Sequence, residues 1–119
     1  MRDRGIGSGG ALPWLNQRIT GIVLTPILLT HLLTMHRYHK HGLAWNDVIA
    51  LLNKPYWKVL EVSFLVLALY HAVNGGYSLA QDYVKKPGAR LTIFGVLMLM
   101  ALALLAFGLV TVFSIKQPV

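Results

Sequence analysis

Three long apolar runs restrict this chain to very few folds. They cover residues 19–35, 59–79 and 91–115, and the first extends back to Pro13, a residue suited to a first helical turn. About 20 apolar residues are needed to cross a hydrocarbon core of ~30 Å. In lipid the backbone must satisfy its own hydrogen bonds, which a helix does within a single segment. The sequence therefore predicts an all-α, integral membrane bundle of three transmembrane helices.

The composition agrees with residence in a membrane. Of the 119 residues, 55% are hydrophobic and only 13% are charged, whereas a soluble domain carries about 25% charged residues. We expect transmembrane helices over approximately 13–35, 57–80 and 90–115 within a single membrane domain, 1–119, whose residues 1–12 form a flexible tail. The first run is too long for the apolar region of a signal peptide, and no small-residue cleavage site follows it. The cytoplasmic membrane of a bacterium or archaeon is the expected location.

The charged residues exclude some classes of partner. The formal net charge is +7, but the basic residues flank the apolar runs and form no patch of the kind that binds nucleic acid. Membrane lipid headgroups or an anionic partner suit them better. The absence of cysteine excludes disulfides and cysteine-ligated iron–sulfur clusters within this chain. Basic residues in the short connection 82–90 favour a cytoplasmic N-terminus and an external C-terminus.

The connections carry weaker local signals. Between the first two spans, Asn46 and Asp47 are expected to cap a short helix over 48–52. Between the last two spans, Pro87 and Gly88 are expected to form the turn. Three aromatic residues are typical of an interfacial belt: Trp45, Tyr56 and Trp57.

A histidine in the second run carries most of the functional information. His71 precedes Asp82 by eleven positions, and at ~100° per residue these two residues lie on nearly the same side of a helix. Asn74, Gly75 and Ser78 lie on the same stripe. An ionisable group this deep in lipid is energetically costly and usually marks a cofactor, a proton path or an ion path.

The residues around His71 leave two interpretations open. A neutral histidine can hydrogen-bond to a neighbouring helix. Alternatively, imidazole suits iron, so His71 can be an axial haem ligand. Ala72, Gly75 and Gly76 reduce the side-chain bulk beside it. Such small residues leave room for a flat macrocycle or for a closely packed helix.

His31 is a second histidine within an apolar run. A haem iron held by two imidazoles needs ligands on opposite faces of the ring. His31 and His71 therefore either clamp one haem between them or each pair with a histidine of another subunit. Measured from Arg18 and from Asp82, their depths differ by only ~3 Å, so helical rise alone does not decide.

Polar residues near the ends of the spans have ordinary and functional interpretations. Asp82 and Tyr83 can be a hydrated helix end with an interfacial tyrosine. They can also form a quinone site, where the phenol donates a hydrogen bond and the carboxylate orients it, with Arg18 binding an anionic group on the same side. Glu61 is expected to reach the interface or to pair with Lys58, three positions earlier.

Three motifs appear together in this order: Gln17-Arg18-Ile19-Thr20-Gly21, His71-Ala72-x-x-Gly75 and Asp82-Tyr83-Val84-Lys85. In motif order, length and three-span layout, the chain resembles the small cytochrome b membrane anchor of succinate dehydrogenase (respiratory complex II). The resemblance covers roughly residues 14–114. It implies that the bundle is one half of a heterodimeric cytochrome b anchor.

The resemblance also implies roles for individual residues. His71 would be an axial ligand of haem b, with Gly75 and Ala72 packing beside the haem. His31, within Thr30-His31-Leu32-Leu33, resembles the two-haem pattern and would hold a distal haem. A quinone site is implied for three residues: Arg18, Asp82 and Tyr83.

The same resemblance implies partners and an activity. A larger cytochrome b anchor subunit would share the one or two haems, a flavoprotein subunit would oxidise succinate, and an iron–sulfur subunit would pass electrons towards membrane quinone. Fumarate reductase, which runs the reverse reaction, has the same architecture. Two other classes remain open: a haem-free structural anchor, and a small proton-conducting subunit that uses His71 and Asp82.

Overall fold

The computed structural model describes residues 11–42 and 44–116, and this part of the chain folds into helices without strands. The helices in chain order are α1 (Ala11–Lys40), α2 (Trp45–Leu52), α3 (Pro55–Tyr83) and α4 (Pro87–Ser114). Three of them, α1, α3 and α4, are long and apolar enough to cross a membrane. This confirms the predicted all-α fold with three spans.

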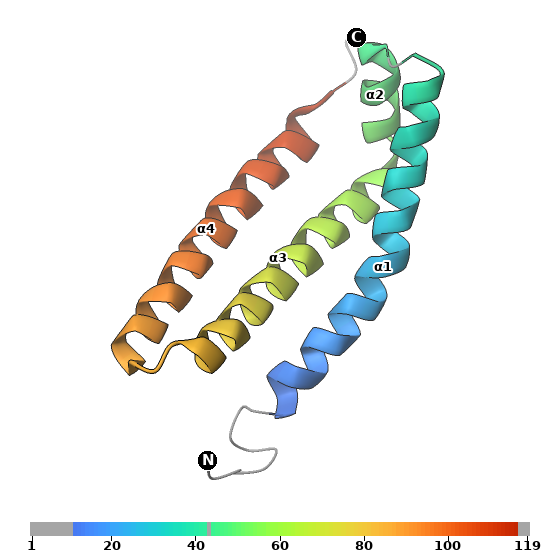
Figure 1. The fold of residues 1–119 in the computed structure, drawn as a ribbon. Coiled ribbons are helices and arrows are strands. Elements are labelled where there is room, and N and C mark those ends of the chain that lie inside the picture. The colour runs from blue at the N-terminus through green and yellow to red at the C-terminus, as the bar shows by residue number, and fades with distance from the viewer. Residues whose placement is uncertain (1–10, 43, 117–119) are drawn as a thin grey trace.

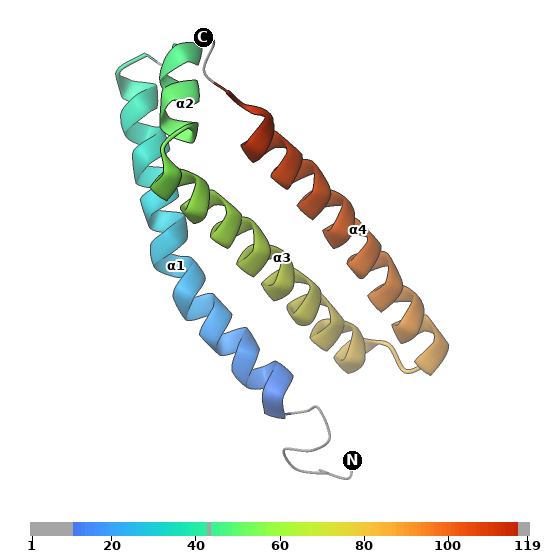
Figure 2. The ribbon, with the colours of Figure 1, turned by 180° about the vertical axis from the view of Figure 1, so that it is seen from behind.

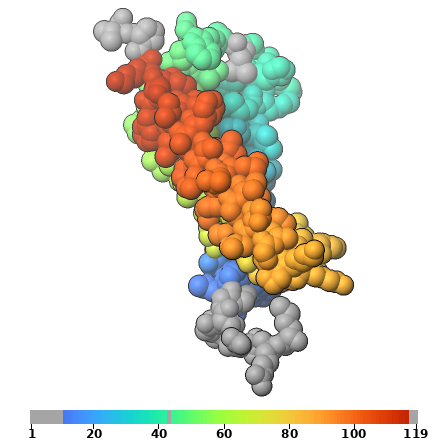
Figure 3. All heavy atoms as spheres, turned by 90° about the vertical axis from the view of Figure 1, so that its left-hand side faces the viewer, coloured from blue at the N-terminus to red at the C-terminus, as the bar shows by residue number. Residues whose placement is uncertain are grey.

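Helix α3 is the central element. It packs against both α1 and α4 along an elongated body of 59 × 25 × 24 Å (Figures 1 and 2). The start of α1 and the α3–α4 connection lie at one end, whereas α2 and the end of α4 lie at the other (Figure 1). In the space-filling view, α4 runs along one long face of the molecule (Figure 3). Neighbouring long helices are therefore antiparallel, as short connections require.

The long helices overlap the three expected spans. Each extends a few residues beyond at least one expected boundary. Residues 1–10 of the expected tail lie outside the described residues, and Ala11 and Leu12 already belong to α1. Length and apolar character thus locate the spans, whereas the ends depend on local chemistry.

Proline marks the start of two helices. Pro55 begins α3 and Pro87 begins α4. The first helical position needs no N–H, and the fixed φ of proline suits it. The prediction that Pro87 and Gly88 form a turn was therefore wrong, because both residues belong to α4 and the connection comprises only residues 84–86.

The predicted capping of the short helix was also wrong. Helix α2 begins at Trp45, and its N-cap is Ala44, which makes no side-chain cap hydrogen bond. Asn46 and Asp47 instead lie in the first turn, where the negative charge of Asp47 interacts favourably with the free N–H groups of the helix end.

The described residues bury few apolar side chains. The buried ones are Ile49, Leu51, Trp57, Ala80 and Val112. Large apolar side chains are exposed on both outer helices, for example Ile22 on α1 and Leu99 and Phe107 on α4. Apolar surface on this scale requires lipid or partner subunits to cover it.

Glycines allow α3 and α4 to approach each other. A Cβ atom on Gly76 of α3 would lie 3.1 Å from Leu97 Cδ1, and one on Gly108 of α4 would lie 2.5 Å from Leu65 Cδ2. A Cβ on Gly95, also in α4, would meet nothing within 4 Å. The close approach is therefore confined to particular glycines.

This difference provides a matched test of the α3–α4 contact. Gly108→Leu should destabilise the protein by about 1–3 kcal/mol, the usual range for overpacking a tight contact. Gly95→Leu makes the same change in the same helix and should have little effect. Thermal unfolding of the purified protein in mild detergent, followed by helical circular dichroism, measures both variants. Equal stability of the two would contradict the close contact at Gly108.

Candidate functional site

Two histidines occupy different levels of the α1–α3 interface. His71 of α3 contacts Thr20 of α1, whereas His31 of α1 contacts Glu61 of α3. Glu61 and His71 are ten positions apart in α3, which corresponds to roughly 15 Å along the helix axis. The interface therefore has two separate imidazole sites.

Both ring nitrogens of His71 have partners on α1. Its Nδ1 lies 2.9 Å from Thr20 Oγ1, and its Nε2 lies 3.2 Å from Gln17 Nε2. A Cβ atom on Gly21 would lie 3.4 Å from His71 Cε1, so the backbone of α1 runs close to the edge of the imidazole. The ring is half-buried and held in position from one side.

Asn74 fixes the orientation of the Gln17 amide. Asn74 Nδ2 donates to the backbone oxygen of Pro13 at 2.9 Å and to Gln17 Oε1 at 2.8 Å. The oxygen of Gln17 is therefore used as an acceptor, and its amide nitrogen faces His71 as a donor. A donor facing Nε2 requires that this nitrogen of His71 carries a lone pair.

Thr20 completes the assignment of the imidazole proton. Its hydroxyl donates to the backbone oxygen of Asn16 at 2.8 Å, so its oxygen remains free to accept from His71 Nδ1–H. His71 is then the neutral tautomer with the proton on Nδ1 and a bare Nε2. A neutral imidazole with one free nitrogen is the form that ligates a metal.

The surroundings of His71 fit an axial haem ligand. The group facing its bare Nε2 is the flexible side chain of Gln17. A Cβ on Gly75 would lie 2.6 Å from Gln17 Nε2, so the space left by this glycine is the space into which Gln17 extends. Ala72 is exposed on α3, whereas Gly76 faces Leu97 of α4. Displacement of one side chain would make Nε2 available to iron.

His31 lies in an aromatic site with one carboxylate. Its Nδ1 is 2.8 Å from Glu61 Oε1, and its ring stacks with Trp57 and Phe64 at centroid distances of 6.1 and 5.6 Å and interplanar angles of 18° and 12°. Trp57, Glu61 and Phe64 are four and three positions apart, so they share one face of α3. The side chains of His31 and Glu61 are 27% and 16% exposed.

Two predictions about this region were wrong. Glu61 pairs with His31 instead of Lys58, because it faces α1 about two turns into α3. Trp57 is only 4% exposed, unlike the exposed Trp45 and Tyr56, and so does not belong to an interfacial belt. An intramembrane carboxylate is itself a signal of function, and that signal identifies Glu61 in the sequence.

The indole of Trp57 adds a further polar feature beside His31. Its Nε1–H is buried and has no hydrogen-bond partner among residues 11–42 and 44–116. A buried N–H without an acceptor is energetically unfavourable.

The expected depths of the two histidines were wrong. The predicted difference of ~3 Å assumed that Arg18 and Asp82 lie at the same depth in the membrane. In the structure it is Asn74 that lies level with the start of α1, because it contacts Pro13. Asp82 lies eight positions further along α3, roughly 12 Å beyond the level of Asn74. The actual register does not bring His31 and His71 face to face.

The three residues expected at a quinone site are only partly brought together. Asp82 and Tyr83 are the last residues of α3 and are exposed, Tyr83 by 83%. Arg18 lies over the ring of Trp14, with 4.2 Å from its guanidinium carbon to the ring centroid, a cation–π contact. Among the described residues, Arg18 forms no ion pair with Asp82.

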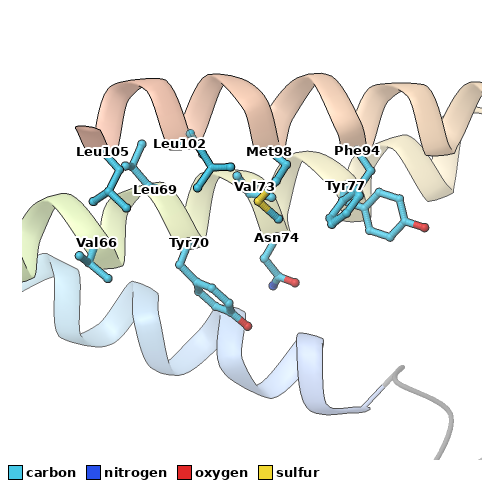
Figure 4. Close-up of a pocket in the computed structure, with 11 residues that line it drawn as sticks. Val66, Leu69, Tyr70, Val73, Asn74, Tyr77, Phe94, Met98, Leu102 and Leu105 are labelled. Carbon is cyan, nitrogen blue, oxygen red and sulfur yellow. The ribbon is translucent and has the colours of Figure 1, made fainter. Parts of the chain in front are cut away.

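A groove between α3 and α4 was not anticipated from the sequence. Its volume is about 340 Å³ (Figure 4). It is lined by Val66, Leu69, Tyr70, Val73, Asn74, Tyr77, Phe94, Met98, Ala101, Leu102 and Leu105. In the close-up, Tyr70 and Asn74 extend on the side where α1 lies (Figure 4). Because the lining is almost wholly apolar, its residues resemble lipid-facing residues in the sequence.

Comparison with known proteins identifies the family of the chain. The model of a family described as succinate dehydrogenase/fumarate reductase transmembrane subunit matches residues 2–109. A relative from Archaeoglobus fulgidus, the succinate dehydrogenase hydrophobic membrane anchor subunit, is 28% identical over 107 residues, which cover 87% of this chain and 89% of the relative. The resemblance found in the motifs is thereby confirmed at the level of the family. The chain belongs to the family of succinate dehydrogenase/fumarate reductase transmembrane subunits.

Proposed function

We propose that the chain is the membrane-anchor subunit of a succinate:quinone oxidoreductase. His71 and His31 each provide one axial ligand to a separate haem b, and the end of α3 forms part of the quinone-reduction site. The larger cytochrome b anchor subunit provides the other ligand of each iron. The chain catalyses nothing alone, because its residues position cofactors and substrate that partner subunits share.

The observation that carries this proposal is the hydrogen-bond network of His71. Thr20 holds the proton on Nδ1, and Gln17 faces a bare Nε2. An iron ligand needs a neutral imidazole whose Nε2 carries a lone pair, and this network provides one once the Gln17 side chain moves away. The same network also joins α1 to α3, so the haem content of the complex is what separates ligation from interhelical packing alone.

The separation of the two histidines supports two haems. His31 lies level with Glu61 of α3, and His71 is ten positions further along that helix, roughly 15 Å away. This distance is too long for the two histidines to ligate opposite faces of one iron. Each histidine therefore requires a second imidazole from outside the chain. The exposed surfaces of α1 and α3 leave room for the helices that would supply it.

The end of α3 supports the quinone assignment. The phenol of Tyr83 is exposed and can donate a hydrogen bond to a quinone oxygen, while the adjacent carboxylate of Asp82 can orient the phenol or exchange protons with water. When bound, haem b carries single electrons between the iron–sulfur subunit and quinone. Arg18 contacts the ring of Trp14. We assign it to this site either as the partner of a haem propionate or after its side chain has moved away from Trp14.

Orientation and partners follow from the same end of the molecule. Lys85 and Lys86 lie in the exposed α3–α4 connection, and an excess of basic residues in short loops favours the cytoplasmic side. The N-terminus is then cytoplasmic and the C-terminus external, in the membrane of a bacterium or archaeon. The iron–sulfur and flavoprotein subunits dock at the cytoplasmic end, beside Asp82 and Tyr83.

Haem quantitation in the intact purified complex tests the proposal. Pyridine haemochrome should give two haem b per flavin, with a b-type band in the reduced-minus-oxidised spectrum. One haem would remove the assignment of His31 or of His71, and no b-type band would leave a haem-free anchor. Proton flux through vesicles that contain this chain alone would instead indicate a proton-conducting subunit.

A further inference from the structure

We infer that Glu61 is a positioning residue for His31 as a haem ligand. The inference rests on the proposed function, because it requires haem iron at His31. Glu61 would accept the Nδ1–H of the ligating imidazole, fix its rotation and place a negative charge behind it. Glu61 lies outside the three sequence motifs on which the family resemblance rests.

The geometry leaves one nitrogen of His31 for a metal. Nδ1 faces Glu61 Oε1 at 2.8 Å. Since the two nitrogens point to different sides of the ring, Nε2 is directed away from Glu61, and it has no hydrogen-bond partner in the described part of the chain. The flanking rings of Trp57 and Phe64 lie nearly parallel to the imidazole, at 18° and 12°. The ring can therefore neither tilt freely nor turn without breaking its bond to Glu61.

The three residues that contact His31 come from one stretch of α3 less than two helical turns long, which makes the arrangement rigid: Trp57, Glu61 and Phe64. Trp57 is buried and Glu61 is half-buried. A carboxylate buried in a membrane is unfavourable unless it is paired. A hydrogen bond from the second nitrogen of a ligating histidine to a carboxylate is a common means of fixing ring orientation and raising ligand basicity. Glu61 satisfies both requirements at once.

The charge of Glu61 has a measurable consequence for iron. A ligand made more basic by an anionic acceptor stabilises the oxidised ion more than the reduced one, which lowers the reduction potential. His71 has the neutral hydroxyl of Thr20 in the corresponding place. The haem at His71 therefore serves as an internal reference in the same complex.

Redox titration of the purified complex tests this inference with four variants. Glu61→Gln keeps the shape and a hydrogen-bond acceptor but removes the charge. It should raise the potential of one haem by at least the equivalent of a tenfold change in equilibrium constant, about 59 mV for one electron. Glu61→Asp keeps the charge on a shorter side chain and should produce a smaller shift. Lys58→Gln changes the charge one turn away without touching His31 and should shift neither haem.

His31→Ala identifies which haem is affected. If it removes the haem whose potential Glu61→Gln raises, the inference is supported. If it removes a haem whose potential is unchanged in Glu61→Gln, or if Glu61→Asp shifts it as much, the role of Glu61 is overturned while ligation by His31 stands. If His31→Ala removes no haem, the proposed ligation by His31 fails, and the inference fails with it.

Discussion

Replacement of His71 by alanine should remove one haem b per flavin from the purified complex. The imidazole donates its Nδ1–H to Thr20, and its Nε2, which Gln17 faces, is the atom proposed to bind iron. Alanine has no atom that can replace this ligand. Loss of one of two axial imidazoles leaves iron with a single protein ligand. Pyridine haemochrome and the reduced-minus-oxidised spectrum measure the loss, while flavin content reports whether the complex has assembled.

Gln17→Ala is the matched control for this variant. It removes the other partner in the Gln17–His71 contact, which joins two nitrogens 3.2 Å apart. If the contact serves mainly to hold α1 against α3, both variants should weaken assembly to a similar extent. If Gln17 only occupies the position that iron takes, Gln17→Ala should keep its full haem content. Full haem content in His71→Ala would overturn the assignment of His71.

The fold follows from the sequence to a large extent because its main determinant is local. An apolar run of about 20 residues must be helical in lipid whatever surrounds it, so three runs predict three spanning helices. The ends were less predictable. Pro87 is compatible both with a turn and with a first helical position, and Asn46 favours a cap that the backbone places at Ala44 instead.

The candidate site was predictable one helix at a time. Helical periodicity placed His71 and Asn74 on one face of α3, and both contact α1. Helical periodicity contains no information on the axial position of one helix relative to its neighbour. This register depends on interhelical contacts, among them that of Asn74 with Pro13. The relative depths of His31 and His71 were therefore wrong, although each residue was identified.

The residues that were missed act through the partner helix. Gln17 and Thr20 lie in a motif that the resemblance singled out, but a polar residue near a helix end is equally typical of the interface. Their role appears only when α1 lies against His71. Glu61 was expected to reach the interface or to pair with Lys58, because spacing along one helix allows that pair. Its contact with His31 requires the second helix.

Tyr83→Phe should impair quinone reduction and leave succinate oxidation by an artificial dye nearly unchanged. The hydroxyl of Tyr83 makes no hydrogen bond within the described residues, and the side chain is 83% exposed, so its removal should not disturb the fold. Loss of the hydrogen bond that Tyr83 is proposed to donate to a quinone oxygen should cost about 0.5–1.5 kcal/mol, which is about 2- to 13-fold in turnover. Steady-state rates with quinone and with dye, measured on the same purified complex, give the ratio.

Tyr77→Phe controls for the general effect of losing a phenol from α3. Tyr77 lies six positions earlier in the same helix and packs edge-on against Phe94, with ring centroids 5.1 Å apart. Its ring stays in place without the hydroxyl, so both rates should remain at the level of the unmodified complex. A fall in quinone turnover in both variants would indicate a shared effect on α3 packing. Unchanged quinone turnover in Tyr83→Phe would exclude Tyr83 as the donor and move the quinone headgroup away from the end of α3.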